Sequence, residues 1–185
     1  EGVNTLEGAA HIFVALPVPN ARLYPVLLDA FHLDDQRKVQ WVKQVGTDPQ
    51  NTHAFKYRQR TATAATLEYS VIVRIEEMYL IVAEAAAEMG DLETCSSSLN
   101  VLRSRAGLPS LNFTDRQSAL DAVLKERRLE LFCEFGHRFY DLKRTDRLHY
   151  LSGVKQNWQQ HFNILPLPEN ELLLNPNLLP QNSGY

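Results

Sequence analysis

The sequence predicts an all-α fold, and the main evidence is a pair of helical stripes in the middle of the chain. Apolar residues recur at steps of three and four, as on one face of an α-helix, at Ile72, Ile75, Tyr79, Val82, Ala86 and Met89. A second stripe consists of Leu92, Cys95, Leu99, Leu102 and Ala106. Gly90 suits the end of the first helix and Asp91 the N-cap of the second. We therefore expect two antiparallel helices joined by a short turn.

The length of this pair is close to that of one tetratricopeptide repeat. It runs from about residue 72 to 106, against roughly 34 residues for the repeat, and we find no second copy of comparable quality. A single repeat cannot bury both of its faces, so this pair needs neighbours. The prediction is a tetratricopeptide-like helix pair plus further helices.

The rest of the chain divides into three parts around that pair. Residues 1–68 read as irregular, with long loops broken by Gly, Pro, Asn and Asp and a short helix between Leu23 and Leu33. The helical core spans 69–150, with a third helix beginning at a Thr114-x-x-Gln117 capping box. Residues 151–185 read as an extended carboxy-terminal tail, with one helical turn at Glu169–Leu173 after Pro168.

Charge and composition limit the classes of partner. The 19 basic and 22 acidic residues give a net charge of −3, without a basic run or stripe, so we predict no nucleic-acid partner. No apolar run approaches the roughly 20 residues that cross a bilayer. The amino terminus, Glu1-Gly2-Val3-Asn4, carries neither a signal-peptide pattern nor a lipid-attachment cysteine.

Patterns typical of metal or cofactor chemistry are missing from the sequence. Glu134-x-x-His137 matches half of a di-iron carboxylate motif, but a second Glu-x-x-His does not occur. The six histidines are scattered, and there is no nucleophile elbow, phosphate-binding glycine loop or pair of zinc ligands. We predict no metal, no cofactor and no catalytic residue.

The densest charge cluster lies between residues 125 and 144. Glu126, Glu130 and Glu134 follow one another at steps of four, which is repulsive unless cations compensate. One interpretation is a carboxylate pair for acid–base work, as in a hydrolase that uses Glu126 and Glu130. The favoured interpretation is a structural network of arginines and carboxylates, formed by Arg127, Arg128, Glu130, Glu134 and Arg138.

Aromatic side chains outside the helical stripes are the candidates for ligand binding. A ring can stack on the apolar face of a sugar, and we single out Trp41, Tyr57 and Trp158. The alternative is that each ring packs a loop against the helices.

Several segments, in order, resemble the SusD/RagB family of nutrient-binding proteins. The stretch from Arg74 to Ala85 resembles the family's "R-x-x-E-x-Y-L-x-x-A-E-A" helix, and residues 99–109 resemble "L-N-x-x-R-x-R-A-G-L-P". Residues 126–144 are similar to "E-R-R-x-E-L … G-H-R-x-x-D-L-x-R". The tail resembles the closing "P-I-P … N-P-N-L … Q-N-P-G-Y", and Asp35-x-Arg37 fits an upstream "D-x-R".

This resemblance implies a specific biology. It implies the carboxy-terminal part of a surface lipoprotein of the outer membrane of Bacteroidetes-type bacteria, with a lipid anchor outside this chain. Such a protein binds a glycan or another nutrient over a SusC-like TonB-dependent transporter and is not an enzyme. The alternative is a tetratricopeptide-like adaptor that binds a peptide or protein partner in a helical groove.

Overall fold

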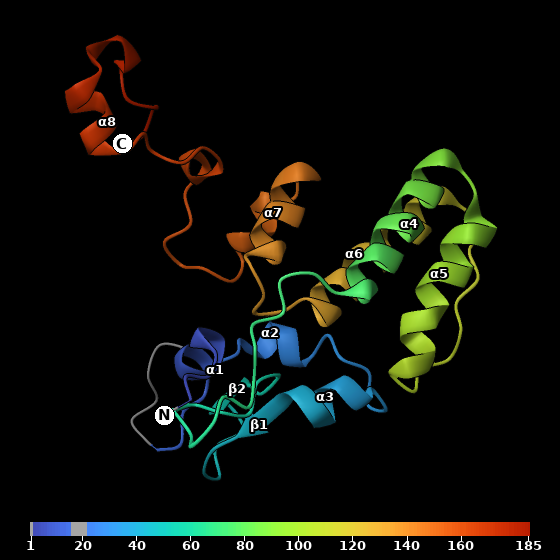
Figure 1. Ribbon diagram of the computed structural model, residues 1–185. Helices are drawn as coiled ribbons and strands as arrows, with labels where there is room; N and C mark the ends of the chain where they lie inside the picture. The colour runs from blue at the N-terminus through green and yellow to red at the C-terminus, as the bar shows by residue number, and fades with distance from the viewer. Residues whose placement is uncertain (1, 16–21) are drawn as a thin grey trace. The chain divides into compact units, whose positions relative to one another are not determined.

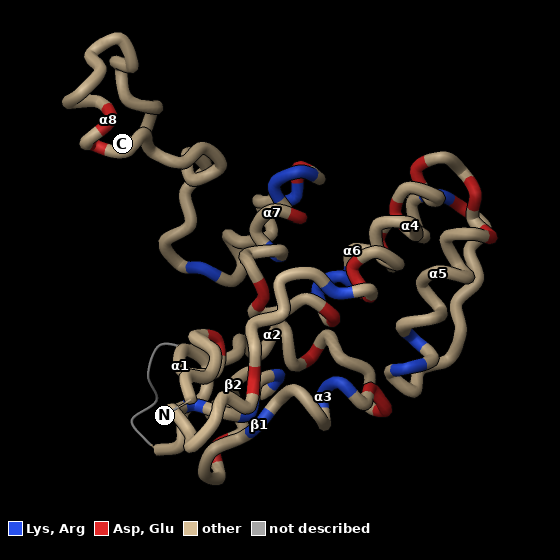
Figure 2. Tube along the Cα trace, viewed as in Figure 1, with Lys and Arg blue, Asp and Glu red and all other residues tan. Residues whose placement is uncertain are grey.

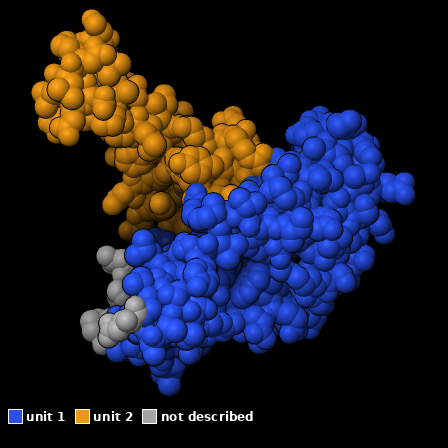
Figure 3. Space-filling view, viewed as in Figure 1, with its two compact units in different colours: residues 1–135 blue, residues 136–185 orange. Residues whose placement is uncertain are grey.

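The structure is a computed structural model that describes residues 2–15 and 22–185, and it is mostly helical (Figure 1). It divides into two compact units, residues 1–135 and residues 136–185 (Figure 3). The first unit contains α1 (Leu6–His11), α2 (Pro25–Leu28), α3 (Gln36–Trp41), β1 (Val42–Gln44), β2 (Thr52–Ala54), α4 (Ile75–Met89), α5 (Leu92–Arg105) and α6 (Arg116–Glu130). The second contains α7 (His137–Arg144), η1 (Leu148–Leu151), η2 (Gln160–Asn163), α8 (Glu169–Leu174) and η3 (Pro176–Leu178).

The helical fold class is confirmed, with a small antiparallel hairpin of β1 and β2 added to it. Its register pairs Val42 with Ala54 and Gln44 with Thr52. Across the described residues, the helices are all too short or too polar to span a bilayer. Figure 2 shows Lys and Arg interspersed with Asp and Glu along the first unit, without a long stretch of one sign.

The predicted helix pair is formed by α4 and α5. Gly90 ends α4 with φ 80°, a conformation that favours glycine, and its N–H donates to the carbonyls of Ala86 and Ala87. The Asp91 carboxylate then caps α5 by accepting from the N–H of Thr94 at 3.0 Å. Helix α4 begins at Ile75, later than the start near residue 72 that the apolar stripe predicts. The β-branched run of residues 71–73 fits an extended backbone better than a helix, and the Val71 N–H donates to the Tyr57 hydroxyl at 2.9 Å.

The buried face of α4 is not the face that the apolar stripe suggests. Leu80, Ala83 and Ala87 are fully buried, whereas Val82 is 46% and Met89 85% exposed. The alanines let α5 and α6 approach closely, and the core of the first unit forms there around Leu99, Leu102 and Val123, among others. The stripe residues Ile75, Tyr79, Val82 and Met89 therefore form an exposed apolar face of α4.

Helix α6 connects this core to the amino-terminal segments. Its N-cap is Asp115 rather than Thr114, because the Asp115 carboxylate accepts from the Ser118 N–H at 2.8 Å and from the Ser118 hydroxyl at 2.6 Å. At the other end, Leu129 and Phe132 pack with Leu23, Phe31 and Ala54 in a second core. A short helix does occur in the expected region 23–33, as α2, and the hairpin follows α3 directly.

The second unit fastens its own carboxy-terminal tail. The Gln181 side chain bonds both the N–H and the carbonyl of Leu167, at 2.8 and 2.9 Å. The Tyr185 hydroxyl donates to the Ile164 carbonyl at 2.9 Å, and its ring lies 4.9 Å from the ring of His161. Gly184 has φ 100°, and a Cβ added there would lie 2.4 Å from the His161 ring. The glycine of the closing motif is therefore needed for the tail to pack on η2.

Candidate functional site

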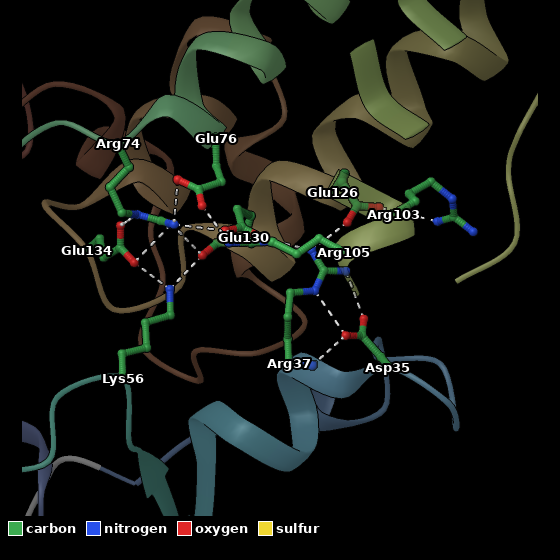
Figure 4. Close-up of polar contacts among 10 residues, drawn as sticks. All are labelled: Asp35, Arg37, Lys56, Arg74, Glu76, Arg103, Arg105, Glu126, Glu130 and Glu134. Carbon is green, nitrogen blue, oxygen red and sulfur yellow. Dashed lines mark hydrogen bonds and ion pairs between the residues drawn. The ribbon is translucent and has the colours of Figure 1, made fainter. Parts of the chain in front are cut away.

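The most prominent polar site is a buried charge network in the first unit. Figure 4 shows its ten residues, five acidic and five basic: Asp35, Arg37, Lys56, Arg74, Glu76, Arg103, Arg105, Glu126, Glu130 and Glu134. The three glutamates spaced at four residues belong to α6 and the turn after it. Their side chains meet cations from the amino-terminal segments, from the start of α4 and from the end of α5.

Arg37 joins α3 to α6. The Asp35 carboxylate caps α3 by accepting from the Arg37 N–H and also receives a bidentate pair from the Arg37 guanidinium, at 3.0 and 2.8 Å. Arg37 Nη1 lies 2.5 Å from Glu126 Oε1 and 3.1 Å from Glu130 Oε2. All of these side chains are almost fully buried. Such planar, bidentate pairing is a geometry that arginine provides and lysine does not.

Glu130 is the centre of the network. It is fully buried, and its Oε1 accepts from Arg74 Nη1 at 2.8 Å and from Arg105 Nη2 at 2.6 Å. Burial alone would raise the pKa of the Glu130 carboxyl. The hydrogen bonds and charges of Arg74 and Arg105 outweigh burial and hold that pKa below its usual value. Glu130 is therefore ionised at neutral pH.

Lys56, which follows β2, brings an ammonium group into contact with two aromatic rings. Its Nζ lies 4.7 Å from the Trp41 ring centroid and 4.3 Å from that of Phe132. It donates to Glu134 Oε1 at 2.5 Å and to the Glu130 carbonyl at 2.6 Å. Burial lowers the pKa of Lys56 to about 8, and the charge of Glu134 offsets this only in part.

This arrangement is suited to structure rather than to acid–base chemistry. Five carboxylates face five cations, so the charges balance, and a general acid or base would need a carboxyl that is free to exchange protons with a substrate. Among residues 2–15 and 22–185, there is no group of three or more His, Cys, Asp or Glu side chains that could hold a metal ion.

Of the five residues that we expected in a structural network, Glu130 and Glu134 lie inside it. Arg127 is buried, with Nη2 4.0 Å from Glu77 Oε1, and Arg128 donates to the Val26 carbonyl at 3.0 Å. Arg138 belongs to α7 in the second unit. The carboxylates of the three glutamates pair instead with cations from segments that are distant in the sequence.

Sequence reasoning missed five cations of the network: Arg37, Lys56, Arg74, Arg103 and Arg105. The sequence did contain a signal for them, because four of these five cations are arginines of the family motifs that the sequence matches. Arg37 ends the "D-x-R" pattern, Arg74 opens the α4 motif, and Arg103 and Arg105 form the "R-x-R" of α5. These separate motifs converge on α6 in space, which is a physical reason for their occurring together.

The three candidate binding rings each have packing partners. Trp41 is partly buried against the second core and lies under Lys56 and Arg105. Tyr57 holds the backbone of Val71 through its hydroxyl. Trp158, in the second unit, packs edge-on against Phe162 at 5.7 Å. Trp41 and Tyr57 belong to one unit and Trp158 to the other.

Comparison with known proteins points to one family. The protein-family model described as "SusD family" matches residues 41–185. A SusD-like protein, P38, from Formosa agariphila is 29% identical over 161 residues, covering 82% of this chain and 32% of that protein. SusD-like protein P2 from the same organism is 36% identical over 129 residues, covering 61% and 25%. This chain thus spans about a quarter to a third of the curated relatives that it matches.

Solved structures share the fold. A SusD superfamily protein from Parabacteroides distasonis superposes with a TM-score of 0.71 at 22% identity, covering 89% of this chain and 42% of the other. Surface glycan-binding protein A from Bacteroides uniformis superposes with a TM-score of 0.69 at 23% identity, covering 87% and 40%.

Proposed function

This chain belongs to the SusD family, and we propose that it forms part of a nutrient-binding protein on the bacterial outer-membrane surface. In this proposal the protein binds a glycan and delivers it to a SusC-like TonB-dependent transporter. The observation that carries the proposal is the family match over residues 41–185. The likeness of its fold to a surface glycan-binding protein supports the choice of a glycan as the nutrient.

The proposed activity is binding without chemical change of the ligand. The hydrolase alternative needs Glu126 and Glu130 to line an open cleft, yet both are buried among arginines. A pair of buried, compensated carboxylates leaves no position for a water and a sugar between them. Purified protein should therefore leave every glycan that it binds at its original length, and measurable shortening that Glu130→Gln abolishes would contradict the proposal.

The candidate contacts are the rings of Trp41, Tyr57 and Trp158, of which Trp41 and Trp158 can be tested by one titration series. Glycans of increasing length are titrated against the full-length wild-type protein and its Trp41→Phe and Trp158→Phe variants, with Tyr69→Phe as the control for an exposed ring. Loss of stacking area on a sugar should weaken binding by severalfold, since an aromatic contact contributes on the order of 1 kcal/mol. If no glycan binds the full-length wild-type protein, the proposed function fails. If glycans bind but both variants match wild type, only these ring assignments fail.

Delivery to a transporter is a separate step and needs its own test. The full-length protein with its anchor should co-purify from the outer membrane with a TonB-dependent transporter encoded beside it. Release of the protein as a free, uncomplexed species after gentle solubilisation would argue against that partner.

One observation favours a second function, that of a tetratricopeptide-like adaptor. The exposed apolar face of α4, with Ile75, Tyr79, Val82 and Met89, resembles a surface on which an amphipathic helix could lie. Binding of helical peptides by this chain, abolished by Val82→Glu and unaffected by glycans, would favour the adaptor over the nutrient-binding protein.

A further inference from the structure

A groove on the first unit is lined by no residue of the charge network and by none of the three candidate rings. It runs between the first three turns of α5 and residues Asn112 and Phe113, and it has a volume of about 430 Å³. That volume falls within the range of roughly 300–1,000 Å³ that is typical of small-molecule sites. The residues that line it are Leu92, Glu93, Ser96, Ser97, Asn100, Asn112 and Phe113.

The walls of the groove are fixed in place. The Asn100 side chain bonds both polar groups of the Leu111 backbone, donating to its carbonyl at 2.9 Å and accepting from its N–H at 2.8 Å. Arg103 Nε donates to the Pro109 carbonyl at 2.9 Å, which holds the same loop two residues earlier. Phe113 is half-buried against the main core. A preformed wall of this kind lowers the entropic cost of binding a ligand.

The polar groups that face the groove include two without a partner. Among the described residues, the Glu93 carboxylate and the Asn112 amide form no hydrogen bond or ion pair, and both are exposed. The hydroxyls of Ser96 and Ser97 donate to backbone carbonyls of α5, at 2.7 and 3.1 Å, so their lone pairs still accept. The groove therefore combines donors, acceptors and a partly exposed ring.

We propose that this groove binds one sugar unit of a neutral glycan, as a contact additional to the three candidate rings. The proposal rests on the proposed function, because it takes the ligand to be a glycan. A sugar presents an apolar face to a ring such as Phe113 and hydroxyls to a carboxylate and an amide. Glu93 lies in the first turn of α5, directly after the acidic N-cap Asp91. This local negative charge disfavours uronate- or sulfate-bearing sugars, since like charges repel.

The test uses a panel of neutral oligosaccharides and of uronate- and sulfate-bearing oligosaccharides, titrated against the chain while its backbone amide NMR signals are followed. Binding of a neutral oligosaccharide should shift the amides of residues 92–100 and 111–113. Asn112→Ala should raise the dissociation constant by up to about tenfold, through the loss of one hydrogen bond. Glu93→Gln, which exchanges a charged acceptor for a neutral one, should raise it by a smaller factor. Both positions are exposed, so the variants should fold. Phe113→Leu, which keeps an apolar side chain against the core, should also weaken binding.

The matched control is Gln117→Ala, an exposed amide on α6 whose side chain donates to Asp121 outside the groove; it should bind as wild type does. Glu93→Gln removes a negative charge, so it should also reduce the ratio of the affinity for neutral sugars to the affinity for uronate-bearing sugars. If neither the wild-type chain nor the full-length protein binds any member of the panel, the proposed function falls together with this site. If it binds but the groove variants match Gln117→Ala, or the shifts lie elsewhere, the groove proposal alone is overturned.

Discussion

Removing the charge of Glu130 should destabilise the first unit more than removing the charge of an exposed carboxylate does. Glu130→Gln keeps the shape of the side chain but leaves Arg37, Arg74 and Arg105 without their shared carboxylate. Breaking a buried pair by removing one partner costs about 3–5 kcal/mol. Each arginine retains another carboxylate, Glu126, Glu134 or Glu76 respectively, so we expect the lower end, about 3 kcal/mol.

The assay is urea unfolding at pH 7, followed by tryptophan fluorescence in a Trp158→Phe background. With only two tryptophans in the chain, Trp41 then reports on the first unit alone. The matched control is Glu88→Gln, which removes a carboxylate from the exposed pair with Arg116 and should cost under about 1 kcal/mol. If Glu130→Gln and Glu88→Gln lost the same amount of unfolding free energy, the idea that burial makes the ion pairs of Glu130 more stabilising would be refuted.

The same variant carries a pH dependence with a defined sign. Because the pKa of Glu130 is lowered in the folded state, its contribution is fully present above the unfolded value of about 4.3. It is lost as the pH falls toward the folded value. The difference in unfolding free energy between wild type and Glu130→Gln should therefore shrink below about pH 4.3. A difference that stays constant down to pH 3 would contradict this reasoning.

Three further predictions follow from other parts of the structure. The pKa of Lys56 falls from 10.5 to about 8 on folding, so the unfolded state holds more protons between these values. Wild type should thus gain up to about 3 kcal/mol relative to Lys56→Met as the pH rises through that window, and parallel stability curves for the two proteins would show that Lys56 keeps its ordinary pKa. Leu80→Ala should lower the free energy of unfolding by about 2–5 kcal/mol, and Val82→Ala should lower it by under about 1 kcal/mol, as measured by urea unfolding. A larger loss for Val82→Ala than for Leu80→Ala would mean that the apolar stripe containing Val82 is the buried face of α4 after all. Gly184→Ala should free residues 181–185 from η2, because the added Cβ would meet the His161 ring. Limited proteolysis should then remove the tail faster from this variant than from the control variant Asn177→Ala. Equal rates of cleavage would mean that the packing of the tail does not depend on this contact.

The local features of the helix pair could be predicted from the sequence. Gly90 ends α4 and Asp91 caps α5, as expected, because these roles depend on backbone conformation and on a side chain reaching its neighbours in the chain. The helical turn after Pro168 is present as α8, with Pro168 as its N-cap rather than as its first helical residue. The ordered motifs gave the family as well, since they depend only on residue identity and spacing.

The sequence by itself thus determined that the central segments are helical, where the helix pair turns and which family the chain belongs to. Helices α1 and α3 and the β1–β2 hairpin, which lie in the region read as irregular, became visible only in the structure. Only the tertiary structure decided that α4 buries its alanine-rich face and exposes Val82 and Met89. A helical period shows which residues share a face, but the fit of neighbouring helices selects the face that is buried. Tertiary structure also decided the partners of Glu130, one of which, Arg37, lies 93 residues away in the chain. Helical spacing places the glutamates in one column, but it carries no information on which distant cation the folded backbone brings to them.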